Sequence, residues 1–183
     1  MQTPTFLTTE ELWGSKDTYW AKQRAIKISK FIDDIETPVA DIGERNPLIQ
    51  FLEKELKIDA VSIEGLDLDY EPLKGKYGTI FCFAVIEHLF NPLYALENLR
   101  KALLNDGYIY LSTPHRPHFL WTEHHFHEMD RQRIRWLFQR AGLDVVDHRR
   151  YALRDKWTTH LTGIRPFLRY FYKSMGLYKL KPI

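Results

Sequence analysis

The apolar positions of this chain fall into two patterns that alternate along its length. Short and nearly continuous apolar runs are typical of strands buried on both faces of a parallel sheet. They occupy residues 39–43, 58–63, 79–85, 108–112 and 143–146. Between these runs, apolar residues recur every three or four positions, which indicates amphipathic helices. The alternation predicts an α/β fold, a three-layer sandwich with helices on both faces of a mostly parallel sheet.

Helix boundaries are marked by residues suited to the ends of helices. Two Asn-Pro pairs, at residues 46–47 and 91–92, combine a capping side chain with a proline that fits the first helical position. Asp130 can cap a further helix, and Gly107 is expected in the left-handed conformation that ends one. Strand, helix and strand between residues 79 and 112 predict a βαβ unit with a right-handed crossover. Ligands of such sheets bind at the carboxyl ends of the strands.

The sheet is expected to be abbreviated between its second and fourth strands. Only residues 65–76 separate the apolar run at residues 58–63 from the run at 79–85, and they include Pro72 and Gly75. A helix followed by a strand hardly fits into this length. We therefore expect an irregular segment there.

A single domain is expected, with residues 1–37 as a helical cap, residues 38–150 as the core and residues 151–183 as a basic aromatic tail. In the tail, seven Lys and Arg residues stand against one acidic residue, Asp155, with aromatic residues between them. Such a segment can pack on the sheet as its last elements, bind a partner or contact an anionic lipid surface. Peripheral membrane contact is therefore one expectation for it.

Composition narrows the classes of function. The chain of 183 residues has a net charge of +2, so it lacks the large positive charge that is typical of nucleic-acid-binding proteins. Its one cysteine, Cys82, lies inside an apolar run and is expected to be a small buried residue. No secretory signal or membrane span is recognisable. A reducing cytoplasmic location fits these features.

The segment FCFAVIEHLFNPLYALENLRKALLNDGYIYLSTP, residues 81–114, resembles the fourth-strand to fifth-strand segment of class I S-adenosylmethionine-dependent methyltransferases. The resemblance rests on the acidic-His-Leu after the strand, the Asn-Pro helix start and the Asp-Gly before a strand ending in Ser-Thr-Pro. It covers about residues 38–149. It implies a Rossmann-like sheet and methyl transfer from S-adenosylmethionine to an unidentified acceptor such as a small molecule, a lipid or a sugar.

The first strand resembles the family's acid-X-Gly motif, with Asp41 and Gly43 opening the cofactor loop. The family has further glycines after this point, whereas this chain has Glu44 and Arg45. Where the chain departs from the family in this way, the side chains could narrow the methionine pocket, or they could substitute chemically, with Glu44 attracting the amino group or the sulfonium and Arg45 the carboxylate. The start of the helix at residues 46–47 is expected to attract the carboxylate as well.

The resemblance also implies an acidic residue that binds the ribose hydroxyls at the end of the second strand. Glu64 is the positional match, with Asp67 and Asp69 as competitors. Phe83, at the end of the Thr79–Val85 run, is expected on the cofactor side as well.

Histidine and glutamate are concentrated after the last strand of the βαβ unit. Residues 115–128 contain five His and two Glu, and His88 follows a neighbouring strand. His88 and His125 are candidates for a general base. Structural hydrogen bonding and metal binding are alternatives, but the spacing is not that of a regular metal site, so no metal is predicted. The alternative functions are a non-catalytic partner- or membrane-binding domain of this fold and, less favoured, a metal-dependent hydrolase.

Overall fold

The computed structural model describes residues 18–115, 121, 123–152 and 174–183 of the chain. From α2 to β5, its helices and strands follow the order that the apolar pattern predicts. In chain order, the elements are α2 (Thr18–Ser29), β1 (Val39–Ile42), α3 (Pro47–Leu56), β2 (Ala60–Ile63), β3 (Tyr77–Phe83), the short 3₁₀ helix η1 (Ile86–His88), α4 (Pro92–Ala102), β4 (Leu103–His115), α5 (Arg131–Arg140), β5 (Leu143–Ala152) and β6 (Ser174–Pro182).

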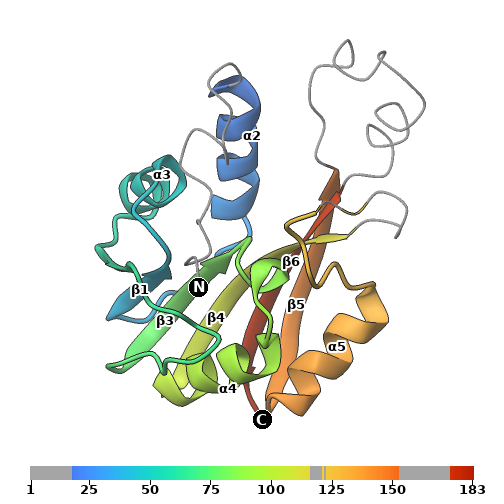
Figure 1. Cartoon of the computed structure of the whole chain (residues 1–183). Coiled ribbons are helices and arrows are strands. Elements are labelled where there is room, and N and C mark those ends of the chain that lie inside the picture. Colours follow the sequence, from blue (N-terminus) through green and yellow to red (C-terminus); the bar gives the residue numbers. More distant parts are fainter. Residues whose placement is uncertain (1–17, 116–120, 122, 153–173) are drawn as a thin grey trace, which may run out of the picture.

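The strands form one six-stranded sheet in the order β2-β1-β3-β4-β6-β5 (Figure 1). β1 pairs in parallel with β2 and β3, and β3 pairs in parallel with β4. β6 runs against the others, since it is antiparallel to both β4 and β5. The predicted mostly parallel sheet is confirmed. Residues 64–76 contain no helix or strand, so the predicted abbreviation is confirmed as well.

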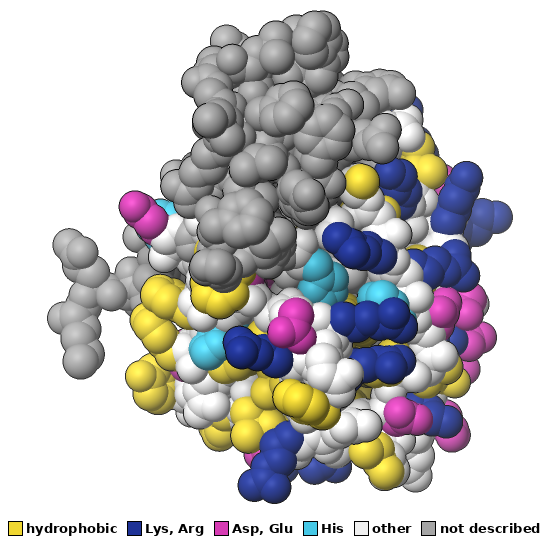
Figure 2. Space-filling view, turned by 90° about the vertical axis from the view of Figure 1, so that its right-hand side faces the viewer, with side chains coloured by type: hydrophobic (Ala, Val, Ile, Leu, Met, Phe, Trp, Pro, Cys, Tyr) yellow, Lys and Arg dark blue, Asp and Glu magenta, His cyan; other side chains and the backbone are white. Residues whose placement is uncertain are grey.

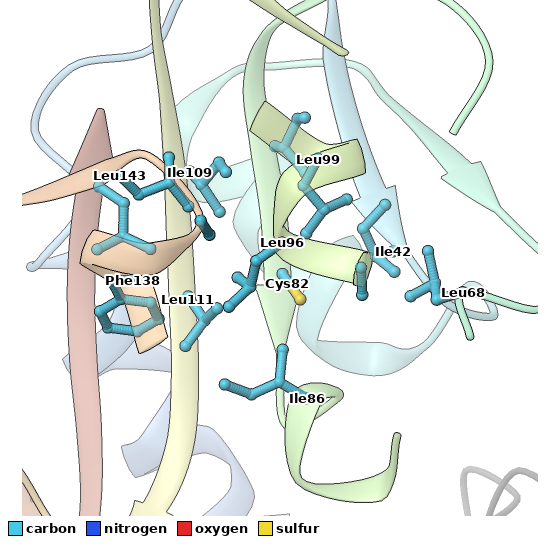
Figure 3. Packing of buried hydrophobic residues seen from close by; sticks show 14 of the residues in the cluster. Ile42, Leu68, Cys82, Ile86, Leu96, Leu99, Ile109, Leu111, Phe138 and Leu143 are labelled. Carbon is cyan, nitrogen blue, oxygen red and sulfur yellow. The ribbon is translucent and has the colours of Figure 1, made fainter. Parts of the chain in front are cut away.

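Helices cover both faces of this sheet and complete the three layers (Figure 1). Successive strand residues point to opposite faces. Phe81 and Tyr110 therefore pack with α2 and α3, whereas Cys82 packs with Leu96 of α4 and Phe138 of α5. Figure 3 shows this second core. Cys82 is fully buried in it, which confirms its predicted role as a small apolar residue.

Three helix starts carry the caps expected from the sequence. Asn46, Asn91 and Asp130 each accept backbone N–H groups from the first turn of α3, α4 and α5 through a side-chain oxygen. These caps satisfy donors that the helix itself leaves unpaired. The chain directions at these three points are thereby set by local sequence.

The prediction for Gly107 was wrong. α4 already ends at Ala102, and Gly107 lies within β4 rather than in a left-handed turn. A Cβ atom at this position would come within 2.7 Å of the backbone oxygen of Gly78 in β3. Glycine is needed here because two strands approach closely.

β6 comes from the segment expected to form a basic aromatic tail. Its residues lie between two other strands, and Tyr178 is fully buried. The tail was expected to pack on the sheet, to bind a partner or to contact a lipid surface. For residues 174–182, the first of these alternatives holds, because they form a strand of the sheet. Residues 153–173 lie outside the described residues, and membrane contact through them stays a prediction. In the part of the chain that the structure describes, no helix is both long and apolar enough to span a bilayer.

Lys179 is a buried cation in β6 that links the C-terminal strand to the segment before β1. Its Nζ atom lies 2.7 Å from Oδ1 of Asp33 and also bonds Asp34. Tyr110 donates a hydrogen bond of 2.8 Å to Asp33. Burial opposes ionisation of Asp33, but the hydrogen bonds from Lys179 and Tyr110 outweigh it and lower the pKa of that carboxyl group. The network joins segments about 145 residues apart in sequence.

Replacing Lys179 by Met is expected to lower the free energy of unfolding at neutral pH by about 1–3 kcal/mol, because hydrogen bonds to charged groups are lost. Asp33 has a lowered pKa in the folded state, so its contribution is present above its ordinary pKa of 3.8 and is lost as the carboxylate is protonated at lower pH. The difference between the variant and the parent should therefore shrink in acid.

Urea unfolding followed by circular dichroism at about pH 7 and about pH 3 measures both effects. Lys181→Met, at an exposed position of the same strand, is the matched control and should change stability little. Equal losses in the two variants would contradict the role given to Lys179.

Candidate functional site

The carboxyl ends of β1, β2, β3 and β4 lie along one edge of the sheet because these strands are parallel. This edge carries the side chains that the sequence singles out, in two groups. One group follows β1 and β2. The other follows β3 and includes a histidine from the segment between β4 and α5.

Asp41 is the buried carboxyl group of the first group. Its side chain lies within the structure at 4% exposure, and Oδ2 has no hydrogen-bond partner among the described residues. Burial and then the charge of Glu53 raise the pKa of Asp41 to about 7, although Arg45 acts in the opposite direction. Groups perturbed in this way are common at sites that bind ligands. Asp41 is therefore available to a cationic group.

The backbone at Gly43 leaves open space beside Asp41. Gly43 has a φ of +126°, and apart from its two chain neighbours no atom of the described residues lies within 4 Å of the position that a Cβ would take. Its N–H donates to the carbonyl oxygen of Ile63 at 3.2 Å, which holds the loop against the end of β2. Only glycine adopts this backbone conformation without strain, so a ligand can approach the main chain closely here.

The residues that follow Gly43 do not have the contacts expected for binding a ligand carboxylate. Arg45 donates two hydrogen bonds to Glu53, at 3.1 and 2.5 Å, so its charge is compensated within the protein. The side chain of Asn46 occupies the N–H groups in the first turn of α3. The geometry therefore does not support the expectation that Arg45 and this helix start hold a carboxylate. Glu44 is exposed to solvent.

The three acidic residues considered after β2 have different surroundings. Glu64 is exposed, and its Oε1 accepts the backbone N–H of Arg45 at 3.1 Å. Asp67 accepts the N–H of Asp69 in a local turn. Asp69 accepts the backbone N–H groups of residues 90–91, one on each oxygen, at 3.1 and 2.7 Å. Asp69 therefore holds the start of α4, while Glu64 lies beside the loop that follows β1.

The end of β3 turns sharply toward the sheet edge. Phe83 stacks on Phe81, with ring centres 5.4 Å apart, on the face that α2 and α3 cover. The next residue, Ala84, has a φ of +57°, and its N–H donates to both the carbonyl and the hydroxyl oxygen of Ser112. A non-glycine residue in this conformation is strained. The strained turn directs η1 and its polar side chains to the edge.

The two histidines predicted to be catalytic lie next to each other. The rings of His88 and His125 meet edge to face, with centroids 4.7 Å apart. Nδ1 of His88 lies 2.8 Å from the carbonyl oxygen of His124, and Nδ1 of His125 lies 2.6 Å from a carboxylate oxygen of Glu128. Burial and then the neighbouring His125 lower the pKa of His88. The His88 ring is therefore neutral at pH 7.

Glu87 belongs to this second group, although it was not among the residues predicted for the site. It is buried, and it brings a carboxylate oxygen within 4.8 Å of nitrogens of His88 and His125. The sequence does place Glu87 directly after a buried strand and next to His88, which could have indicated a role in the site. The sequence does not indicate that Glu87 and His125 lie close together, because they are far apart in the chain.

The other described histidines of residues 115–128 do not join this pair. His124 is exposed. The ring of His127 lies 3.3 Å from the carbonyl oxygen of Phe90, and its backbone N–H donates to the carbonyl of Glu87. His118 lies outside the described residues. The described histidines at 124 and 127 thus position the segment rather than enter the site.

A further histidine group lies on the side of the molecule formed by β5 and α5, where Figure 2 shows cationic side chains gathered around histidines. His115 lies 2.7 Å from the hydroxyl oxygen of Tyr178 and 2.9 Å from the carbonyl of Met129. Tyr178 also packs against His148. Burial and then the positive charge of Arg131 lower the pKa of His148 to about 4. The group connects β4, β5 and β6.

A hollow of about 230 Å³ lies at the opposite edge of the sheet. It is lined by Glu36, Thr37, Gly78, Leu104, Asn105, Asp106 and Gly107. These residues precede β1 or adjoin the beginnings of β3 and β4. Buried ionisable groups meet at the carboxyl ends of the strands instead, and we place the candidate site there.

Comparison with known proteins identifies a family. Residues 34–148 match the model of a family described as Methyltransferase domain. A search of curated proteins returned no significant match.

Several solved structures share the fold. The S-adenosylmethionine-dependent methyltransferase from Geobacter sulfurreducens, in complex with S-adenosyl-L-homocysteine, is 14% identical with a TM-score of 0.55, covering 88% of this chain and 91% of that one. The O-methyltransferase from a trans-AT PKS multienzyme of Brevibacillus brevis, also in complex with S-adenosyl-L-homocysteine, is 13% identical with a TM-score of 0.55, covering 99% and 81%. The cyclase SpnF is 8% identical with a TM-score of 0.59, covering 89% and 81%. Likeness of fold alone therefore leaves the reaction open.

Asp41→Asn is expected to raise the free energy of unfolding at about pH 8 by ~1–3 kcal/mol, because it removes a buried charge. The folded-state pKa of about 7 is above the ordinary value of 3.8, so Asp41 binds its proton more tightly in the folded state. Its contribution to stability is full below the ordinary pKa and is lost as the pH rises through the folded-state pKa.

The gain should therefore be small at about pH 4. Urea unfolding at the two pH values, with Asp144→Asn at an exposed position of β5 as the control, measures it. A variant that is less stable than the parent at pH 8 would contradict the assignment of a buried, uncompensated carboxyl group.

Proposed function

This chain belongs to the methyltransferase-domain family, and we propose that it binds S-adenosylmethionine and transfers the methyl group to an acceptor molecule. The observation that carries the proposal is the buried Asp41 carboxyl group, whose Oδ2 lacks a partner among the described residues, beside the open space at Gly43. A carboxylate next to an approachable backbone fits a ligand that carries an amino group. The two solved methyltransferases with bound S-adenosyl-L-homocysteine, which share the fold, support this choice of cofactor.

The first group of side chains has the chemistry to hold this cofactor. Asp41 offers a carboxylate to the amino group, and Gly43 lets the ligand approach the main chain. Glu64 accepts the N–H of Arg45 through Oε1, which leaves Oε2 for the ribose hydroxyls. The other proposed cofactor residues are Glu44, Asp67 and Phe83.

S-adenosylmethionine, when bound, supplies a methyl group on a positively charged sulfur, which an acceptor atom displaces in line. The task of the protein is to hold the acceptor atom about 3–3.5 Å from the methyl carbon and aligned with the bond that breaks. Where the acceptor must lose a proton, a neutral imidazole can take it up. His88 and His125 suit this task because each engages its Nδ1 with a fixed acceptor, which leaves Nε2 to accept a proton. The proposed acceptor is a small molecule, including lipids and sugars.

Isothermal titration with S-adenosylhomocysteine tests the proposal. We expect binding that is roughly ten- to a hundred-fold weaker than in relatives with a glycine-rich loop, because one or two backbone hydrogen bonds of about 0.5–1.5 kcal/mol each are missing. Gly43→Val should abolish binding, since the side chain strains the loop and fills the open space. Glu64→Gln should weaken it, while the amide oxygen can still accept the N–H of Arg45.

Glu55→Gln, at an exposed position of α3, is the matched control and should bind as the parent does. Circular dichroism verifies that each variant is folded. Absence of binding at millimolar ligand in folded parent protein would favour a non-catalytic domain of the same fold.

We also propose peripheral membrane contact through the basic residues between 154 and 173. Each Lys or Arg near an anionic bilayer contributes about 1 kcal/mol, so replacing Arg165, Arg169 and Lys173 by Gln should reduce liposome binding at low salt by roughly a hundred-fold or more. Removing the chain after Arg150 is an unsuitable test, because it also removes β6 from the sheet. Co-sedimentation with anionic liposomes gives the answer, and unchanged binding of the triple variant would refute the contact.

A further inference from the structure

Three side chains able to bind a metal ion meet at the carboxyl end of β3. Glu87 and His88 come from η1, and His125 comes from the segment before α5. One potential ligand atom from each lies within 4.8 Å of the other two. The two imidazole rings already face one another edge to face. The cluster is assembled by the fold, because His125 lies 37 residues after His88 in the chain.

Hydrogen bonds set which nitrogen of each ring can bind an ion. A carbonyl and a carboxylate can only accept, so the Nδ1 atom that contacts His124 or Glu128 carries the proton whenever its ring is neutral. The lone pair of each neutral ring is then on Nε2. Proteins orient metal-binding histidines in this way, with the other ring nitrogen donating to a carbonyl or a carboxylate.

The segment that carries His125 is fastened to η1 by backbone contacts. The N–H of His127 donates to the carbonyl oxygen of Glu87 at 3.1 Å. On the other side of the segment, the ring of His115 contacts the carbonyl of Met129. The relative placement of His88 and His125 therefore does not depend on their side chains alone.

Charge favours a cation at this position. Glu87 and Glu128 are both buried, with exposures of 1% and 3%. Glu128 contacts the ring of His125 directly. A divalent cation between Glu87 and the two rings would meet carboxyl groups that the fold has already removed from water, so binding it requires little further desolvation of these groups.

We propose that Glu87, His88 and His125 bind one divalent transition-metal ion of the zinc type, through one carboxylate oxygen and the two Nε2 atoms. Two imidazoles and a carboxylate form a donor set that such ions bind in proteins. Tetrahedral ligands at about 2.0–2.1 Å from zinc lie about 3.4 Å apart, so binding draws the three groups together by small side-chain rotations. Three protein ligands leave a coordination position open, as at catalytic rather than structural zinc sites.

The open position suggests the class of acceptor, and this part rests on the proposed function. With the ion bound, the Nε2 lone pairs of His88 and His125 are engaged by it, so the metal replaces the imidazoles as the group that activates the acceptor. An oxygen donor of the acceptor can take the open position, where the positive charge lowers the pKa of a hydroxyl group and its proton is released to water. The acceptor would then be a hydroxylated molecule, and the site would favour methylation at oxygen.

The spacing of His and Glu within residues 115–128 alone does not predict a metal site. The ligands proposed here combine one residue of that segment with two that follow β3, a set that no local spacing can reveal. His124 and His127, the residues a local site would use, are exposed or bonded to backbone.

The test is isothermal titration of zinc chloride into tag-free protein that has been treated with a chelator, at about pH 7.5. We expect one equivalent to bind, and we expect His88→Ala, His125→Ala and Glu87→Gln each to weaken binding by at least about a hundred-fold. Glu128→Gln should weaken it by about ten- to a hundred-fold, since it only orients a ligand. His124→Ala, which keeps the backbone carbonyl that contacts His88, and Glu123→Gln are the matched controls at exposed positions of the same segment, and both should bind zinc as the parent does.

Absence of zinc binding by the parent overturns the site, and so does loss of binding in the control variants with retention in the His88 and His125 variants. If Glu87→Gln does not fold, the two histidine variants still decide the question. Parallel titration with S-adenosylhomocysteine separates the two proposals. Zinc binding without S-adenosylhomocysteine binding supports the metal site and removes the proposed function, and the reverse result removes the metal site alone.

Discussion

The insertion of β6 between β4 and β5 is the constraint on which the rest of this structure depends. Among the described strands, β5 pairs with β6 alone, and β6 also satisfies one edge of β4. Without it, both strands would expose unpaired backbone groups. Two consecutive residues secure it from opposite faces. Tyr178 packs against Phe138 and His148 on the α5 side, while Lys179 pairs with the aspartates before β1 on the α2 side.

This strand also acts on the candidate site at a distance from it. Tyr178 bonds the ring of His115 at the end of β4, and the same ring contacts the carbonyl of Met129. Met129 ends the segment that brings His125 to His88. The position of the second histidine thus follows from the pairing of the last strand, which explains why a site after β3 requires the C-terminal part of the chain.

The two sides of the site differ in the hydrogen bonds that fix their backbone. On the side after β3, Ser112 accepts the N–H of the strained Ala84, and Asp69 accepts backbone N–H groups at the start of α4. On the side after β1, internal contacts of Arg45 and Asn46 take up groups that a ligand could otherwise use. Asp41 remains buried with an unsatisfied oxygen. A buried carboxyl group with an unsatisfied oxygen lowers the stability of the folded state, and such groups are common at functional sites.

The sequence by itself determined the class of fold and the main boundaries, since buried strands, Asn-Pro helix starts and short connections are local signals. It also placed His88, Asp41 and Gly43 at strand ends, because parallel strands bring their carboxyl ends to one edge. It did not reveal that β6 enters the sheet, nor that Gly107 serves close strand contact rather than a turn. Tertiary structure alone likewise decided three further contacts. Glu87 lies close to His125, Glu53 pairs with Arg45, and Asp69 accepts the backbone N–H groups at the start of α4. Each depends on contacts between residues far apart in the chain or on the direction of side chains, and local pattern carries no information about either.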